Sequence, residues 1–177
     1  MTSINDFKAY LSGGGARANQ FRVTIFSPPD INIGLTDLRR TSFLVRASSL
    51  PAMAIPEIAI PFRGRSIYIA GDREFADPWT TTFMNDTDFM IRNAMEKWSN
   101  GINDLVLNTG SIHPSEYQAD LVVEQLDRDD KILKSYIFRS AWPTEITAID
   151  LTSDAADAIE EFDVTWRYQH FEASGVN

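Results

Sequence analysis

Acidic side chains come nearest to a catalytic arrangement in this chain, because two carboxylates at a suitable separation can hydrolyse a glycosidic bond. Asp154, Asp157, Glu160 and Glu161 lie in one short segment. Their spacing along the chain does not set the distance between any two carboxyl groups, and a solvated acidic face accounts for the cluster more simply. A carboxylate-pair hydrolase therefore stays a distant hypothesis.

The two histidines, His113 and His170, are candidates for metal ligands. A metal site would need them to be joined by further ligands at regular spacing. His113 stands before Pro114 in an expected loop, and His170 continues the alternation of an expected strand. We therefore predict no metal site.

Two loops resemble ligand-binding motifs but lack the residues that those motifs need. The acidic run that begins at Asp127 has Ile132 at its sixth position and Phe138 at its twelfth, where a calcium loop needs glycine and glutamate. The glycine-rich run at 12–15 lacks the lysine and the hydroxyl residue of a phosphate-binding loop. The sequence thus predicts no cofactor and no catalytic residues, and so a protein that is not an enzyme.

Arg63 and Arg65 flank Gly64 in an expected turn and form the remaining candidate site. Two guanidinium groups this close can clamp a phosphate. Cations at the tip of a turn can also pair with an acidic neighbouring subunit and fix the register between partners, and we favour this interpretation. We therefore predict that Arg63, Gly64 and Arg65 contact another subunit.

The composition is that of a globular domain with an acidic surface. The 177 residues include 44% hydrophobic and 23% charged residues, which is enough to build a core. The net charge of −9 argues against a sequence-reading nucleic-acid binder, which would show a basic face. The chain has no cysteine, so disulfides and thiolate metal sites are excluded.

The elements that must position these residues are mostly short strands. Apolar and polar residues alternate in several segments, which is the pattern of half-buried strands. Pro56 and Pro61 predict an edge strand, because proline has no amide donor. We expect strands at 21–25, 43–47, 55–62, 67–70, 79–84, 117–124, 132–140 and 162–169, and a further extended segment at 145–151 that follows a bend at 141–144.

One helix is expected after the strand at 79–84. Asp86 is the predicted N-cap, and Asn100 with Gly101 supplies the C-terminal stop. Helical spacing places one apolar stripe on the buried face. The stripe consists of Ile91, Ala94, Met95, Trp98 and Ile102.

The number of strands predicts a mainly β fold, either a β-barrel or two packed antiparallel sheets, with one flanking α-helix. We expect a single domain over residues 1–177. An N-terminal arm would occupy residues 1–19 and a C-terminal tail residues 172–177.

Six segments, in their order along the chain, are together specific for a known family. They are DFKAYLSGGGARANQFRVTI, FLVRASSLPA, IPFRGRSIYIAGDREF, WTTTFMNDTDFMIRNAMEKW, YQADLVVEQLDRDDKILKSYIFRSAWPTEITAIDL and IEEFDVTWRYQHF. In these segments the chain resembles the tail-tube proteins of contractile-tailed bacteriophages. It is thereby also similar to the inner-tube proteins of contractile injection and type VI secretion systems.

The resemblance implies a structural virion protein that forms rings of six subunits, which stack into the rigid inner tail tube inside the contractile sheath. Neighbouring sheets would join into one barrel around a lumen, which first holds the tape-measure protein and later conducts the phage DNA. The implied partners are further copies of the chain, the sheath, the tape-measure protein, the baseplate and the tail terminator, without a membrane. The implied location is the tail of the virion, after assembly in the cytoplasm of the host bacterium.

The resemblance also implies an acidic lumen. Six copies would carry a charge of −54, which is six times −9. We therefore expect acidic strand residues such as Asp120 and Glu124 to face the lumen. Two other functions stay open, namely the inner tube of a phage-derived injection or secretion machine that carries protein cargo, and a monomeric ligand-binding β-barrel.

Overall fold

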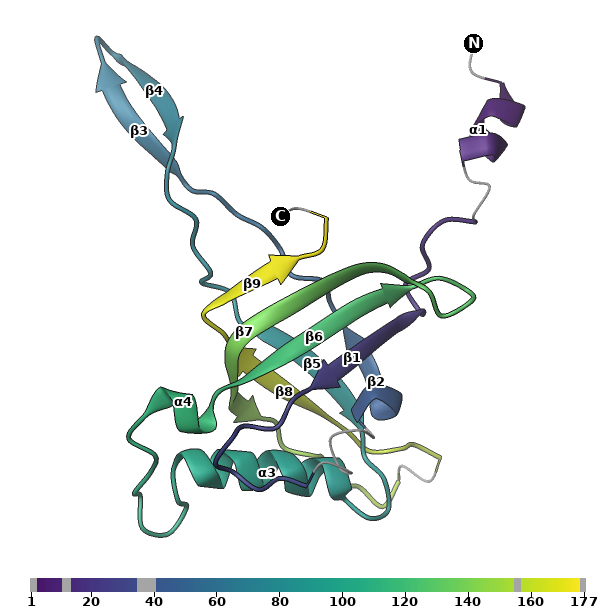
Figure 1. Ribbon diagram of the computed structural model, residues 1–177, viewed down its shortest axis with the longest axis vertical. Coiled ribbons are helices and arrows are strands. Elements are labelled where there is room, and N and C mark those ends of the chain that lie inside the picture. Colours follow the sequence, from purple (N-terminus) through teal and green to yellow (C-terminus); the bar gives the residue numbers. More distant parts are fainter. Residues whose placement is uncertain (1–2, 11–13, 35–40, 155–156, 176–177) are drawn as a thin grey trace.

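A computed structural model describes residues 3–10, 14–34, 41–154 and 157–175. Antiparallel strands dominate these residues, and helices lie outside them (Figure 1). The elements are α1 (Ile4–Tyr10), β1 (Phe21–Ile25), β2 (Val45–Ser48), β3 (Glu57–Phe62), β4 (Arg65–Ala70), β5 (Trp79–Met84), α3 (Met90–Ile102), α4 (Pro114–Tyr117), β6 (Ala119–Leu126), β7 (Ile132–Ile146), β8 (Glu161–Arg167) and β9 (His170–Ala173).

The main sheet folds over on itself to make two facing layers (Figure 1). Its seven strands follow the order β1-β6-β7-β8-β5-β2, and β9 pairs with β7. Among the described residues, β1 and β2 end this path without hydrogen-bonding to each other, so the sheet is open. The expectation of a closed β-barrel is therefore wrong, whereas the alternative of packed antiparallel layers describes the structure. Strands β3 and β4 form a separate two-stranded sheet.

Strand β7 belongs to both layers of the main sheet. Up to Ala141 it pairs with β6 and β9, and from Trp142 it pairs with β8. The change of layer follows Ser140, whose φ of 53° lies in the left-handed region. The sequence predicted a bend at 141–144, and the bend is where the strand changes partners. The strand does not end there, because Trp142 to Ile146 continue the pairing.

Aromatic side chains fill the space between the two layers. The rings of Trp79 and Phe138 stack with their centroids 4.4 Å apart, and those of Phe83 and Phe162 stack at 5.7 Å. All four side chains are buried. Burying each ring stabilises the fold by about 2 kcal/mol or more. The Trp79 and Phe138 rings thus join the two layers across the core, whereas Phe83 and Phe162 are cross-strand neighbours on β5 and β8 within one layer.

Helix α3 lies across one end of the two layers (Figure 1). Its side chains Ile91, Ala94, Met95 and Trp98 are buried, and Ile102 packs against them at the edge of the core. The Trp98 ring meets that of Trp166 edge-on at 5.4 Å, and its Nε1–H donates to the Tyr117 carbonyl at 2.8 Å. The apolar stripe therefore anchors the helix to the sheet.

The start of α3 differs from the sequence prediction. The N-cap residue is Phe89, with a φ of 53°, instead of Asp86. The Asp86 carboxylate still accepts a hydrogen bond from the Met90 amide at 3.0 Å. A turn at residues 87–88 separates the acid from the helix, so Asp86 stabilises the first turn from outside it.

Several other boundaries also differ from the prediction. Residues 41–44 are helical, so β2 begins later than expected. The structure has α1 and α4 in addition to the single helix that was expected. The chain turns after Arg167, so β9 is a separate strand. Strand β9 also reaches into the segment expected as a tail. Residues 155–156, in the acidic segment considered for catalysis, lie outside the described residues. No helix in the described part of the chain is long and apolar enough to cross a membrane.

One buried hydrogen bond between β5 and β8 offers a test of this core. Trp166 Nε1 donates to Thr81 Oγ1 at 2.9 Å, and both residues are fully buried. The substitution Thr81→Val keeps the side-chain shape but leaves the indole N–H without its acceptor, so we expect a loss of about 1–3 kcal/mol in the free energy of unfolding. Urea denaturation of the monomer measures this loss. Thr80→Val, on the exposed face of the same strand, is the control and should change stability by less than about 0.5 kcal/mol.

Candidate assembly interface

The β3–β4 hairpin projects away from the two layers (Figure 1). Its strands pair from Glu57↔Ala70 to Phe62↔Arg65. Arg63 and Gly64 form the two-residue turn with φ values of 46° and 78°. Positive φ at both positions matches the right-handed twist of a hairpin, and glycine adopts it without strain. The sequence therefore placed this turn correctly, although Arg65 already belongs to β4.

One face of the hairpin is almost entirely apolar. Residues opposite each other in an antiparallel pair share a face. Ile58 lies opposite Ile69, Ile60 opposite Ile67, and Phe62 opposite Arg65. These apolar side chains are 44–56% exposed. The hairpin thus holds the apolar side chains of one face about half exposed to solvent.

An isolated two-stranded hairpin is at best marginally stable in water. All twelve strand residues of the hairpin are exposed, so the described part of the chain gives it little cover. At its base, the Gly71 amide donates to the Pro56 carbonyl at 2.7 Å, and a Cβ on Gly71 would lie 2.9 Å from that oxygen. The base is fixed, whereas the described residues leave the apolar face of the hairpin uncovered.

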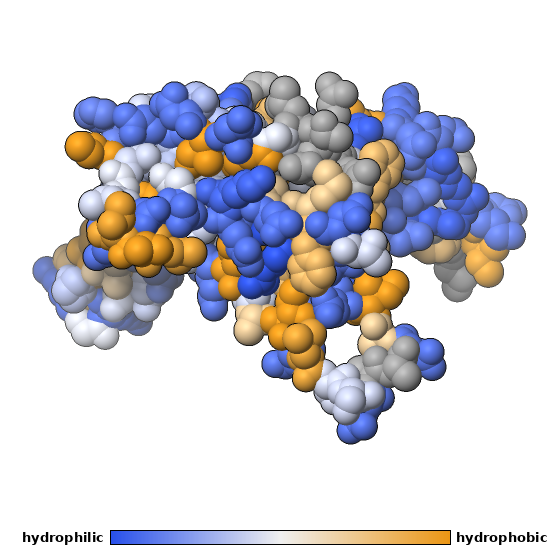
Figure 2. All heavy atoms as spheres, turned by 90° about the horizontal axis from the view of Figure 1, so that it is seen from below, coloured by the Kyte–Doolittle hydropathy of each residue, from blue (hydrophilic) through white to orange (hydrophobic). Residues whose placement is uncertain are grey.

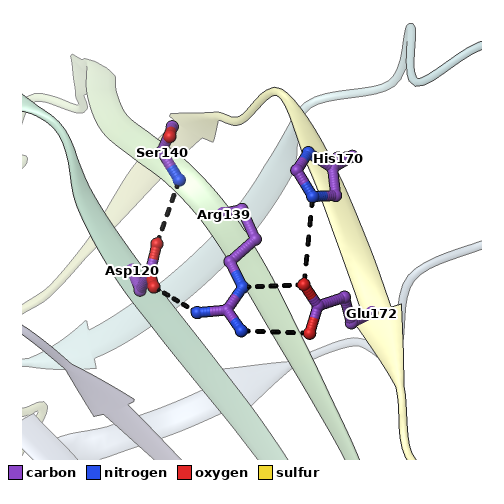
Figure 3. A network of polar contacts seen from close by, with 5 residues as sticks. All are labelled: Asp120, Arg139, Ser140, His170 and Glu172. Carbon is purple, nitrogen blue, oxygen red and sulfur yellow. Dashed lines mark hydrogen bonds and ion pairs between the residues drawn. The ribbon is translucent and has the colours of Figure 1, made fainter. Parts of the chain in front are cut away.

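A second candidate surface is the outward face of β6, β7 and β9 (Figure 3). Arg139 lies between two carboxylates there, with Nη1 2.6 Å from Asp120 Oδ2 and Nη2 3.0 Å from Glu172 Oε2. Asp120 Oδ1 also accepts a hydrogen bond from the Ser140 amide at 3.1 Å. Asp120 therefore braces the residue at which β7 changes layers, a role that the sequence did not predict.

The same face carries a second ion pair, between Arg22 Nε and Glu124 Oε2 at 2.8 Å. Both acids that were expected in a lumen, Asp120 and Glu124, thus lie on one face of β6 and each is paired with an arginine. Hydrogen bonds from Arg139 lower the pKa of the Glu172 carboxyl below its ordinary value, and the same bonds raise the pKa of Arg139. The charges on this face are largely compensated, and the apolar residues Val122 and Ile137 lie between them.

The two histidines lie on different elements, and two of the four acids considered for catalysis are held in polar contacts. His170 lies 4.0 Å from Glu172, whereas His113 is an exposed residue that precedes α4. Glu160 accepts a hydrogen bond from the Asn85 amide group, and Glu161 forms an ion pair with Arg46. Within the described residues, no group of three His, Asp or Glu side chains could hold a metal ion.

Sequence reasoning missed one exposed apolar loop, between α3 and α4. Leu105, Val106 and Leu107 are 72–89% exposed. Such a run of aliphatic residues resembles a piece of core, and the polar residues around it gave only a weak signal of a loop. Figure 2, which views the molecule from the α3 end, shows hydrophobic residues as patches among hydrophilic ones.

The sequence is similar to known tail proteins over nearly its whole length. A family model described as phage tail tube protein matches residues 16–174. The tail tube protein of Serratia phage KSP90 is 32% identical over 170 residues, which cover 95% of each chain. Tail tube protein gp19 of Enterobacteria phage T4 is 31% identical over 166 residues, which cover 93% of this chain and 96% of the relative.

Solved structures of contractile injection systems share the fold. A chain of the sheath-tube complex of the extracellular contractile injection system PVC, in its extended state, matches with a TM-score of 0.60 and 13% identity over 98% of both chains. A chain of the six-fold symmetrised baseplate of the anti-feeding prophage matches with a TM-score of 0.62 and 13% identity, over 92% of this chain and 97% of that one.

The Arg139 network predicts a pH dependence. Because folding lowers the pKa of Glu172 from its ordinary 4.5, the pair stabilises the fold fully above that pH and loses its contribution as the pH falls through the lower folded pKa. Arg139→Gln should return the Glu172 pKa toward 4.5, measured by carboxyl carbon NMR titration of the monomer. Arg22→Gln is the matched control and should leave that pKa unchanged. An unaltered Glu172 pKa in Arg139→Gln would contradict the network.

Proposed function

This chain belongs to the phage tail tube protein family, so its role is structural, and we propose that its copies form six-subunit rings that stack into the inner tube of a contractile tail. The single observation that carries the proposal is the match to tail tube proteins at 31–32% identity over nearly whole chains. The whole of residues 1–177 would form one subunit, with residues 1–19 as an arm toward its neighbours.

Free sheet edges support a ring. The path of paired strands ends at β1 and at β2, and each leaves a row of backbone donors and acceptors on one side. Such edges are a liability in a monomer, and pairing with neighbouring copies satisfies them. Closed cyclic symmetry would give every copy the same two neighbours, so that the free edges of β1 and β2 could pair around the ring.

The hairpin and the arm supply contacts between copies. The tip residues Arg63, Gly64 and Arg65 would meet an acidic surface of another subunit, and the apolar hairpin face would be buried behind them. Helix α1 in the arm exposes Ile4 at 75% and Phe7 at 64%, which suits a segment that packs on a neighbour.

The outward face of β6 would line the lumen through Asp120 and Glu124. Both arginines that lie beside these acids, Arg139 and Arg22, are held in ion pairs. Paired guanidinium groups attract phosphate less than free ones, because the neighbouring carboxylate cancels their field. Such a lumen would let DNA pass without binding it. A reconstruction of the assembled tube that placed Asp120 and Glu124 on the outer surface would refute this assignment.

The remaining partners follow from the tail architecture. Solved structures of similar fold come from sheath-tube, tube terminator and baseplate assemblies, and we extend these contacts to this chain. A tape-measure protein would fill the lumen before DNA does. The subunit would assemble in the cytoplasm of the host and end in the tail of the virion.

Phage tails are favoured over protein-injecting machines, because the relatives of higher sequence identity come from phages. The injection-system structures, with the cap of the anti-feeding prophage included, are at most 16% identical to this chain and so show the fold alone. A ligand-binding barrel is disfavoured, because stacked aromatic rings occupy the space between the layers.

Assembly can be observed directly. Negative-stain electron microscopy of the purified full-length chain at high concentration should show rings or tubes with a central hole. Where the chain alone stays monomeric, a baseplate complex added as a nucleus should be extended into tubes. Monodisperse monomers under both conditions would contradict the proposed function.

Charge reversal tests the hairpin tip. Arg63→Glu combined with Arg65→Glu should leave the monomer folded, since both side chains are exposed, and should prevent or strongly shorten tubes. The matched control reverses two exposed cations in another hairpin turn, Arg128→Glu with Lys131→Glu. Tube length by electron microscopy and monomer stability by thermal melting are the two measurements. Normal tubes from the Arg63 and Arg65 variant would exclude a role for these arginines.

A further inference from the structure

The loop between α3 and α4 is built to hold apolar side chains in solvent. Asp104 Oδ1 accepts hydrogen bonds from the amides of Val106 at 2.9 Å and Leu107 at 2.8 Å. The Leu105 amide donates to Asn100 Oδ1 at 3.0 Å. Hydrogen bonds from the Leu107 and Val106 amides also lower the pKa of Asp104. The backbone of these three apolar residues is therefore fixed.

The rest of the loop closes like a small hairpin. Asn103 and Gly110 form an antiparallel bridge, and the Asp104 amide donates to the Thr109 carbonyl at 2.8 Å. A Cβ on Gly110 would lie 2.1 Å from the Ile102 carbonyl oxygen, so the closure needs glycine. A fixed loop loses little conformational entropy when it binds a partner, which favours a docking role.

The surface of this loop is apolar, with acids beside it. Leu105 is 83% exposed, Val106 89%, Leu107 72% and Ile112 85%. Leu105 also lines a surface hollow of about 300 Å³ together with Pro143, Glu145 and the ion pair of Arg92 with Glu96. Glu145 is exposed, and among the described contacts it has no ion pair. We call Leu105–Leu107, Ile112 and Glu145 the loop surface.

The loop surface and the β3–β4 hairpin lie at opposite ends of the long axis of the molecule (Figure 1). The hairpin offers an apolar face and two arginines, whereas the loop surface offers exposed apolar side chains and the carboxylate of Glu145. The two surfaces are thus complementary in polarity and in charge. Two different complementary surfaces at opposite ends make a head-to-tail contact, which continues from copy to copy without closing.

We propose that the loop surface is the docking site for the β3–β4 hairpin of a second copy of this chain in the next ring. The apolar face with Ile60 and Phe62 lies against Leu105–Leu107, and the tip arginines approach Glu145. This inference rests on the proposed function, since it assigns the acceptor of the hairpin within the stacked tube. It gives the exposed aliphatic residues at both ends of the subunit one common partner.

Cysteine crosslinking tests the contact in assembled tubes, and the absence of native cysteine keeps the readout clean. The full-length variant Phe62→Cys with Val106→Cys, and a second pair Ile67→Cys with Leu107→Cys, are treated with a short bis-maleimide and separated on a denaturing gel. We expect a ladder of covalent multimers that extends past the six subunits of one proposed ring. Each single-cysteine variant, and Thr80→Cys with Val106→Cys, should give no ladder.

The outcomes separate this contact from the proposed function. Tubes without a ladder from either pair would overturn the inference and leave the tube role intact. A ladder that stops at six would place the contact within a ring. A crosslinked dimer from Phe62→Cys alone would place the contact between two hairpins. Either result overturns the stacking contact. Failure of the unsubstituted chain to form tubes, even with a nucleating baseplate, would contradict the proposed function itself.

A second measurement needs no cysteine. Leu105→Asn with Leu107→Asn should leave the monomer folded, because both side chains are exposed, and should raise the protein concentration needed for tubes by about tenfold or more. Arg65→Glu alone should impair tube formation, because it places two acids across the contact. Adding Glu145→Arg to that variant should restore tubes, because the charges across the contact are opposite again. An unchanged concentration threshold together with no rescue would contradict the loop surface as the acceptor.

Discussion

The fold depends on one strand that belongs to two layers. Strand β7 pairs with β6 and β9 in its first part and with β8 in its second, so its change of direction sets how the layers face each other. The change follows Ser140, which has a left-handed φ, and Asp120 accepts the hydrogen bond of the Ser140 amide. A residue that is not glycine adopts this conformation only when its surroundings enforce it. Ring packing between the layers, as between Trp79 and Phe138, supplies that enforcement.

This arrangement separates the core from the surfaces left for partners. The large rings and the α3 stripe are buried between and below the layers, whereas the β3–β4 hairpin and the Asp104 loop carry aliphatic side chains in solvent. A soluble monomer rarely exposes contiguous apolar surface without a use for it. The Asp104 hydrogen bonds fix the backbone of the loop, whereas the hairpin is fixed at its base and at its turn. Under the proposed function, these two surfaces are the ones that meet further copies.

Arg22 and Arg139 on the sheet are ion-paired, whereas the arginines of the hairpin tip have no nearby carboxylate in the sequence. On the outward face of β6, β7 and β9, Arg139 and Arg22 are held between or beside carboxylates. Such exposed pairs add little to stability, so their main effect is to fix side-chain positions and to neutralise local charge. At the hairpin tip, Arg63 lies over the Phe62 ring at 5.4 Å from its centroid, and no carboxylate follows before Asp72. The hairpin therefore keeps cations available for a partner.

The sequence alone determined the faces of individual elements. Alternation located β1, β5 and most of β8, helical spacing identified the four α3 residues that lie in the core, and Gly64 between two arginines located the hairpin turn. These patterns are local, because the side-chain period of a strand or a helix is set by its own backbone. Local alternation does not say which strand lies beside which. Only the tertiary structure decided that the sheet stays open, that β7 spans both layers, that β9 turns back onto β7, and that Arg139 joins Asp120 to Glu172, since each of these depends on hydrogen bonds or contacts between residues far apart in the sequence.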